Sequence, residues 1–143
     1  MHVSDVMTHA AVCARPGDSI AQAAERMRAL DVGALPVCGD SDKLVGMVTD
    51  RDITVRATAE CCDPGGTTVR DVMTPGVIYC FEDQDISEAA KLMEDKQVRR
   101  LVVLNRNKQM VGILSLGDVA TRNADDKLSG EALERISEPV ATA

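Results

Sequence analysis

The 143-residue sequence predicts a mixed α/β (α+β) protein built from two tandem copies of one βαββα unit. The first observation is a repeat at a constant offset of 66 residues: Asp5–Thr8 recurs as Asp71–Thr74, and Val45-Gly46 recurs as Val111-Gly112. The second is a change from helical to strand periodicity within each copy. The third is composition, since 45% of the residues are apolar but only 1% are aromatic, which predicts an aliphatic core.

An amphipathic helix is predicted near the start of each copy. Apolar residues recur with i, i+3, i+4 and i+7 spacing over 20–30 in the first copy and over 86–93 in the second. Ser19 and Gln22 have the spacing of a capping box, and Asp85 with Glu88 is a close variant of it. The alanines in both stretches predict helices that pack closely on a sheet.

Two short strands joined by a polar turn follow each helix. The strands are predicted at 35–38 and 44–49, and again at 101–104 and 110–115. A further strand precedes the helix in each copy, near 11–14 in the first and near 77–81 in the second. A second helix begins at Asp50 in the first copy and near Leu116 in the second. The resulting divisions are repeat 1 (1–62), a linker (63–68), repeat 2 (69–124) and a tail (125–143) in which 129–137 is a candidate helix. Repeats of about 60 residues with so few aromatic side chains are too small to be stable alone, so the copies should share a core.

The charge and the lack of rings exclude several kinds of partner. The net charge of −7 would repel a nucleic-acid backbone, and the scarcity of aromatic residues leaves no stacking surface for bases. No apolar run reaches the roughly 18–20 residues of a membrane span, and the first residues lack the pattern of a secretory signal. We therefore expect a cytoplasmic protein that binds neither nucleic acid nor membrane.

Neither catalysis nor a metal site is indicated by a motif. The sequence has no Walker loop, no GxGxxG and no recognisable arrangement of nucleophile and histidine. Its five cysteines are odd in number and lack CxxC spacing, which argues against a secreted disulfide framework and against a zinc ribbon. We expect a protein that is not an enzyme and holds no metal, with cysteines that serve chiefly as small reduced core residues.

Four segments carry a resemblance to a known family. They are 3–8, 32–37 and, most distinctively, 46–52 (Gly-Met-Val-Thr-Asp-Arg-Asp) and 112–118 (Gly-Ile-Leu-Ser-Leu-Gly-Asp), which both fit Gly-x-x-Thr/Ser-x-x-Asp. Over residues 1–124 the chain resembles the paired CBS domain, named for cystathionine β-synthase, of the stand-alone bacterial signalling type. The resemblance implies two tandem βαββα repeats packed about a pseudo-twofold axis.

The resemblance also implies a regulatory module that binds an adenosine-containing nucleotide (AMP, ADP or ATP, with NAD a further candidate) in the clefts between the repeats. The carboxylates of Asp52 and Asp118 suit the two ribose hydroxyls. The hydroxyls of Thr49 and Ser115 can donate to a phosphate, together with helix-start N–H groups. The residues expected at the phosphate are Arg51, Arg99 and Arg100, and those expected around the adenine are Cys13, Leu35, Pro36, Ile78, Tyr79 and Leu101.

Each of these residues also has an interpretation that needs no ligand. The two hydroxyl–acid pairs have the spacing of helix N-caps, with the acid in the first turn. The arginines can be solvated or ion-paired at the surface. Arg56 and Arg122 lie four residues after the two acids, which is the spacing of an intrahelical ion pair.

The competing functional hypothesis is a ligand-free structural or protein-interaction dimer. The resemblance implies a homodimer, with a cytosolic protein as a further partner. It also places Cys13 and Cys38 on neighbouring strands, so a redox-responsive bridge between them is a further hypothesis. The two clefts are not expected to be equivalent, since Arg51 of the first copy corresponds to Gly117 of the second.

Overall fold

The computed structural model describes residues 1–9 and 12–122, which form two compact units. Residues 12–77 make up one of them, which we call the repeat-1 unit because it contains most of the first copy. Residues 1–9 and 78–122 make up the other, the repeat-2 unit. Each unit is described by itself.

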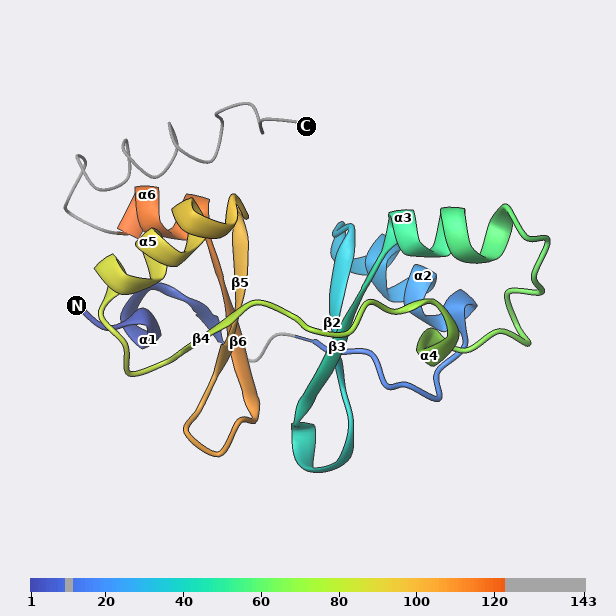
Figure 1. Cartoon of the computed structure of the whole chain (residues 1–143), viewed down its shortest axis with the longest axis horizontal. Coiled ribbons are helices and arrows are strands. Elements are labelled where there is room, and N and C mark those ends of the chain that lie inside the picture. Colours follow the sequence, from blue (N-terminus) through green and yellow to red (C-terminus); the bar gives the residue numbers. More distant parts are fainter. Residues whose placement is uncertain (10–11, 123–143) are drawn as a thin grey trace. The chain divides into compact units, whose positions relative to one another are not determined.

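The repeat-2 unit is built on a four-stranded sheet of order β1-β6-β5-β4 (Figure 1). Its strands are β1 (Thr8–His9), β4 (Tyr79–Phe81), β5 (Arg100–Leu104) and β6 (Met110–Ser115), and its helices are α1 (Val3–Val6), α5 (Ile86–Lys96) and α6 (Leu116–Arg122). Strands β5 and β6 form an antiparallel hairpin. Strand β4 adds to β5 in parallel, and β1 adds to β6 in antiparallel orientation.

The repeat-1 unit follows the same plan with shorter ladders. Its strands are β2 (Ala34–Cys38) and β3 (Leu44–Thr49), its helices are α2 (Ile20–Leu30), α3 (Asp50–Ile53) and α4 (Val69–Val72), and a 3₁₀ turn (Asp40–Asp42) joins the strands. Helix α3 runs directly into a π-helical turn (Thr54–Thr58). Single bridges take the place of the outer strands: Ala14 pairs with Val37 in parallel, and Thr74 pairs with Met47 in antiparallel orientation.

Each unit contains a short helix encoded in the other copy of the repeat. Val3 and Val6 of α1 are buried in the core of the repeat-2 unit, beside Leu114 of β6. Val69 and Val72 of α4 are buried in the core of the repeat-1 unit. The predicted dependence of one copy on the other takes this form, because each core draws apolar side chains from both copies.

The predicted helices and strands are found close to their expected bounds. Helix α2 begins at the capping box, where Ser19 accepts from the Gln22 N–H at 3.1 Å and Gln22 returns a bond at 2.9 Å. Helix α5 begins differently, since the Asp85 carboxylate accepts from the Ser87 N–H at 2.9 Å. In place of the strand expected near 11–14, the described residues show only the Ala14 bridge. The candidate helix over 129–137 lies outside the described residues.

The short helices α1 and α4 were not predicted from the sequence. Helix α4 begins at Thr68, whose N–H donates to the Asp71 carboxylate at 3.1 Å, a capping box of the same kind as that of α2. The equivalent bond before α1 runs from the His2 N–H to Asp5 at 2.8 Å. None of the helices in the described part of the chain has the length and apolar character that a bilayer crossing requires.

Candidate functional site

The junction between β3 and α3 positions the first predicted pair of site residues. Thr49 caps the helix: its hydroxyl accepts from the Asp52 N–H at 3.0 Å, and the Asp52 carboxylate accepts from the Thr49 N–H at 3.0 Å. The second Asp52 oxygen accepts from the Thr74 hydroxyl at 3.4 Å and lies 3.8 Å from the Arg56 guanidinium. With 12% of its side chain exposed, Asp52 presents a narrow carboxylate edge to solvent.

Arg56 does more than form the predicted intrahelical ion pair with Asp52, which the structure confirms. One of its guanidinium nitrogens donates to the Val72 carbonyl at 2.9 Å, to the Met73 carbonyl at 3.2 Å and to the Thr74 hydroxyl at 3.3 Å. It therefore ties the π-helical turn to the segment that follows α4. The side chain of Arg122, its counterpart in the second copy, lies outside what the structure describes.

The first-turn N–H groups of α3 are all engaged within the chain. The Asp50 N–H donates to the Gly33 carbonyl at 2.9 Å, and the Arg51 N–H donates to the Asp50 carboxylate at 2.8 Å. The Asp52 N–H is held by the Thr49 hydroxyl. The junction of the repeat-1 unit thus offers a phosphate fewer N–H donors than the sequence alone suggests.

The junction between β6 and α6 keeps the capping pair and changes its surroundings. Ser115 accepts from the Asp118 N–H at 3.0 Å, and Asp118 accepts from the Ser115 N–H at 3.0 Å. Leu116 corresponds to Asp50 of the first copy, and Gly117 corresponds to Arg51. Among the described residues, no carboxylate therefore accepts from the Gly117 N–H as Asp50 does from the Arg51 N–H. Arg100 is the ladder partner of Ser115, and the carbonyl of its neighbour Arg99 accepts from the Leu116 N–H at 2.8 Å.

The two junctions therefore differ in charge. That of the repeat-1 unit carries two carboxylates, Asp50 and Asp52, together with the exposed Arg51 and with Arg56, which lies 3.8 Å from Asp52. That of the repeat-2 unit carries one carboxylate, Asp118, beside two exposed arginines, Arg99 and Arg100. Among the described side chains, the charges balance at the first junction and leave a net positive charge at the second, and net positive charge attracts anions.

The residues predicted around the adenine fall into a buried group and an accessible group. Leu35 and Leu101 are 2% and 1% exposed and belong to the two cores, so their side chains pack inward. Pro36 is buried too, and its carbonyl accepts from the Ala14 N–H at 2.8 Å. The remaining three are more accessible: Cys13 and Ile78 are half-buried and Tyr79 is 39% exposed.

Within each unit the structure brings together the cap hydroxyl, its acid and the adjoining basic residue. The sequence analysis missed Thr74, which contacts Asp52 from outside the strand-to-helix motif. Its signal was present in the sequence, because Thr74 and its equivalent Thr8 close the duplicated Asp-Val-Met-Thr segment. Both residues pair with the strand that carries the motif, Thr8 with Ile113 and Thr74 with Met47.

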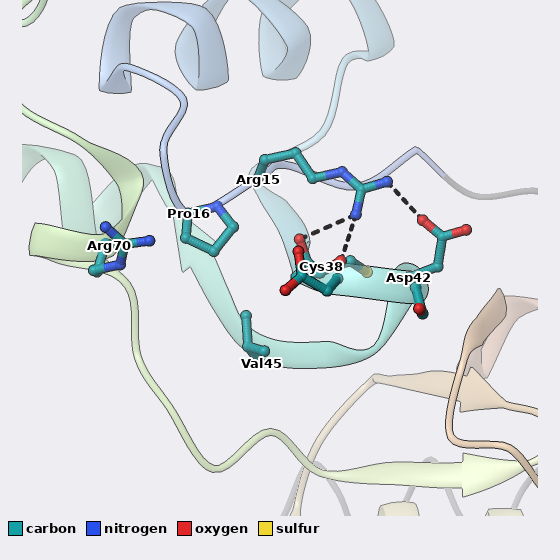
Figure 2. A pocket seen from close by; sticks show the side chains of 9 residues that line it. Arg15, Pro16, Cys38, Asp42, Val45 and Arg70 are labelled. Atoms are coloured by element: carbon teal, nitrogen blue, oxygen red, sulfur yellow. Dashed lines mark hydrogen bonds and ion pairs between the residues drawn. The ribbon is translucent and has the colours of Figure 1, made fainter.

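A pocket of about 620 Å³ lies at the other end of the β2–β3 hairpin, within the repeat-1 unit (Figure 2). The guanidinium of Arg15 connects several lining residues. It donates to the carbonyls of Cys38 and Gly39 at 3.3 and 2.7 Å and pairs with the Asp42 carboxylate at 2.6 Å. Its lining residues are Arg15, Pro16, Cys38, Gly39, Asp40, Ser41, Asp42, Val45 and Arg70. No residue of the predicted nucleotide site lines it.

The family is decided by comparison with known proteins. Residues 3–57 and 69–125 each match the family model of the CBS domain. The chain belongs to the CBS domain family. It is 34% identical to hypoxic response protein 1 of Mycobacterium tuberculosis over 139 aligned residues. The alignment covers 97% of this CBS-domain chain and 96% of that protein.

Solved CBS-domain structures share this fold. Hypoxic response protein I, solved with two coordinated zinc ions, matches with a TM-score of 0.76 and 36% identity over 86% of this chain and 98% of that one. CBSX2 in complex with AMP matches with a TM-score of 0.74 and 30% identity, over 88% and 98% of the two chains. The CBS domain pair of MJ0100, in complex with 5′-methylthioadenosine and S-adenosylmethionine, matches with a TM-score of 0.70 and 27% identity, over 84% and 93%.

The zinc ions of the hypoxic response protein I structure raise the question of a metal site in this chain. Among residues 1–9 and 12–122, no three His, Cys, Asp or Glu side chains are clustered for a metal ion. The two histidines lie near the start of the chain, and the ring of His9 contacts the Ser4 carbonyl at 3.0 Å.

Proposed function

We propose that this CBS-domain pair is a regulatory module, not an enzyme, that binds an adenosine-containing nucleotide at its strand-to-helix junctions. AMP, ADP and ATP are the leading candidates, and NAD is a further one. The observation that carries the proposal is the Ser115–Asp118 junction, where a capping hydroxyl and acid lie beside Arg99 and Arg100. Two solved relatives, CBSX2 and the MJ0100 pair, hold adenosine-containing ligands and support the class of ligand.

The chemistry assigns a separate part of the nucleotide to each group. One oxygen of Asp118 is used by the helix cap, and we assign its other oxygen, which has no partner among the described side chains, to a ribose hydroxyl. The Ser115 hydroxyl accepts from the Asp118 N–H and keeps its own hydrogen for a phosphate oxygen. Arg99, Arg100 and the Gly117 N–H add donors for the same phosphate. The accessible side chains of Ile78 and Tyr79 are the proposed contacts of the adenine.

Thr49, Arg51 and Asp52 form the equivalent proposed site in the repeat-1 unit, with Cys13 on its adenine side. Asp50 weakens that site for a phosphate, because its carboxylate both occupies the Arg51 N–H and repels an anion. The expected order of affinity for AMP therefore places the Asp118 site above the Asp52 site. For adenosine, which has no phosphate, the two sites should differ less.

Calorimetric titration of AMP, ATP, NAD and adenosine tests the proposal on the full chain. Asp118→Asn and Asp52→Asn are matched variants, because an amide oxygen still caps the helix while the charge on the ribose acceptor is lost. We expect Asp118→Asn to weaken AMP by about 10-fold or more, the usual effect of losing a hydrogen bond to a charged group, and Asp52→Asn to weaken it less. Unchanged AMP affinity in both variants would overturn the residue assignment.

The competing function is a ligand-free protein-interaction dimer. The observation that favours it is that both capping pairs are complete in themselves, with all four bonds at 3.0 Å. If none of the four ligands binds and heat denaturation of the purified protein releases no nucleotide, the dimer hypothesis takes its place. Light scattering measures the homodimer proposed under either function, with and without AMP.

A further inference from the structure

The pocket of the repeat-1 unit is assembled from three segments that hydrogen bonds hold in place (Figure 2). The segments are residues 15–16, the turn of the β2–β3 hairpin and the first turn of α4. The Arg70 N–H donates to the Pro16 carbonyl at 3.0 Å, and the Arg15 guanidinium donates to the Gly39 carbonyl at 2.7 Å. Because backbone groups of all three segments are tied together, the cavity is part of the folded unit.

The side chain of Val45 reaches the pocket because of a β-bulge. The register of the β2–β3 hairpin shifts between Val37 and Cys38, which leaves Val45 without a ladder partner. A bulge of this kind redirects the side chain of the extra residue. A Cβ at Gly39 would lie 3.3 Å from the Val45 Cγ1, so the glycine leaves room for the valine. With 40% of the residue exposed, Val45 gives the pocket an apolar surface.

Arg70 is the lining cation that is open to a ligand. Its exposed guanidinium makes no hydrogen bond and no ion pair with any residue that the structure describes. The other lining cation, Arg15, is paired with Asp42 at 2.6 Å. Arg70 and Asp42 lie at opposite ends of the pocket, with Pro16 and Val45 between them (Figure 2). An anion bound at Arg70 would therefore be separated from the Asp42 carboxylate by apolar surface.

The neighbouring acids limit the charge of that anion. Asp40 also lines the pocket, and Asp71, which does not line it, lies close enough to Arg70 for their charges to interact. These carboxylates would repel a dianion such as phosphate more strongly than a monoanion. A carboxylate also matches the planar guanidinium of an arginine with two parallel hydrogen bonds. The charges of the pocket thus favour a single carboxylate over a phosphate.

We propose that this pocket binds a small organic acid, with its one carboxylate paired to Arg70 and its apolar body lying on Pro16 and Val45. The volume of about 620 Å³ is within the range of small-molecule sites. None of the residues of the proposed nucleotide site lines the pocket, so the proposal does not depend on nucleotide binding.

The second unit keeps the backbone of this place and changes its chemistry. The Ser4 N–H donates to the Glu82 carbonyl at 3.0 Å, as the Arg70 N–H does to the equivalent carbonyl of the first unit. At the 66-residue offset, Ser4 corresponds to Arg70 and Phe81 corresponds to Arg15. Neither guanidinium is kept, so the proposed organic-acid site belongs to the repeat-1 unit.

Titration of the ¹⁵N-labelled full chain with hexanoate, followed by NMR, tests the proposal. Hexanoate should shift the backbone amide signals of Gly39, Val45 and Arg70 saturably, with a dissociation constant on the order of millimolar, since so small a ligand makes few contacts. Hexanamide has the same chain without the charge, hexylammonium reverses the charge, and inorganic phosphate lacks the chain. All three should bind at least about 10-fold more weakly than hexanoate.

Three variants separate a specific site from general attraction to surface arginines, and circular dichroism checks that each remains folded. Arg70→Gln should weaken hexanoate by about 10-fold or more, the usual effect of losing a hydrogen bond to a charged group. Arg28→Gln is the matched control, because Arg28 is an exposed arginine of the same unit that does not line the pocket, and its affinity should equal that of the wild type. Val45→Thr, which exchanges one methyl group for a hydroxyl, should weaken hexanoate roughly fourfold.

Three results would overturn the proposal: no saturable shift with hexanoate, equal affinity for hexanamide, or the same affinity in Arg70→Gln and Arg28→Gln. Saturating AMP should leave the dissociation constant of hexanoate unchanged. Displacement of hexanoate by AMP would assign the pocket to the nucleotide site and would also overturn the proposal. If AMP does not bind to the chain, the proposed function fails while the hexanoate result stands.

Discussion

Alanine at Gly112 should destabilise the repeat-2 unit, because the glycine of the Gly-x-x-Thr/Ser-x-x-Asp motif is a packing site. A Cβ at this position would lie 2.5 Å from the Thr8 carbonyl oxygen and 3.0 Å from the Met7 sulfur. Real Cβ atoms essentially never approach within 3.0 Å of another heavy atom, so the backbone of β1 would have to move. Met7 is 2% exposed and part of the core, so this movement disturbs buried packing as well as the β1–β6 ladder.

The magnitude follows from two opposing effects. Overpacking against a backbone atom costs about 1–3 kcal/mol and occasionally more, and Gly112 lies at the severe end because its nearest neighbour is a carbonyl oxygen. Replacing glycine by alanine also lowers the conformational entropy of the unfolded chain, which raises the free energy of unfolding by roughly 0.4–1 kcal/mol. We expect a net loss of about 2 kcal/mol in the free energy of unfolding. Gly46→Ala, with contacts of 3.0 Å to the Thr74 oxygen and the Met73 sulfur, should lose about half as much.

Urea unfolding measures both changes, and the chain supplies a probe for one unit. The sole tyrosine, Tyr79, lies in the repeat-2 unit and there is no tryptophan, so intrinsic fluorescence follows that unit while circular dichroism follows the whole chain. Gly112→Ala should lower the midpoint of the fluorescence transition more than Gly46→Ala does. Gly17→Ala is the control, because its Cβ would meet nothing within 4 Å. A fluorescence midpoint for Gly112→Ala equal to that of the Gly17 control would refute the packing argument.

Three further outcomes are expected. Arg56→Met should lower the free energy of unfolding by about 1 kcal/mol in urea titrations, because its half-exposed guanidinium loses two carbonyls and a hydroxyl. The hydrogen bond from Arg106 lowers the pKa of Asp83 below its ordinary 3.8, so their pairing stabilises the fold above about pH 4 and is lost as the pH falls below it; Arg106→Met should return that pKa toward 3.8 in an NMR titration. Burial raises the pKa of Cys38 and Cys80 to about 12, so neither should react with iodoacetamide at pH 8 in the native, reduced protein, as mass spectrometry would show.

The fold was largely predictable because its strongest signals are local and occur twice. The capping box at Ser19, the alanine-containing helical stretches and the two hairpins each follow from nearby residues, and the 66-residue offset confirmed one copy by the other. The exchange of α1 and α4 between the copies was not predictable. A repeat in sequence shows which residues are equivalent, but it does not show which copy's core buries Val3 or Val69.

The candidate site was predictable in its motif and not in its surroundings. The spacing of Ser115 and Asp118 identified a capping pair in which both bonds are made. The bond from the Arg51 N–H to Asp50 was missed, because the carboxylate comes from the adjacent residue and carries no spacing signal. The adenine residues were predicted by strand position, which does not distinguish an inward side chain such as Leu101 from an outward one such as Tyr79.

The pattern of divergence between the two copies separates packing from function. Positions that are identical at the 66-residue offset, such as Gly46 and Gly112, make equivalent close contacts in both units and set the scaffold. Positions that differ change the chemistry without changing the backbone plan: Leu116 of the second copy corresponds to Asp50 of the first, and Gly117 corresponds to Arg51. Since a duplicated scaffold needs no such differences to fold, the change from Asp50 to Leu116 is the part of the divergence that bears on the proposed preference of a phosphate for the Asp118 site. The AMP titrations of Asp118→Asn and Asp52→Asn test that preference, because both units carry the capping acid and only the repeat-1 unit carries a carboxylate at the preceding position of the helix start, Asp50.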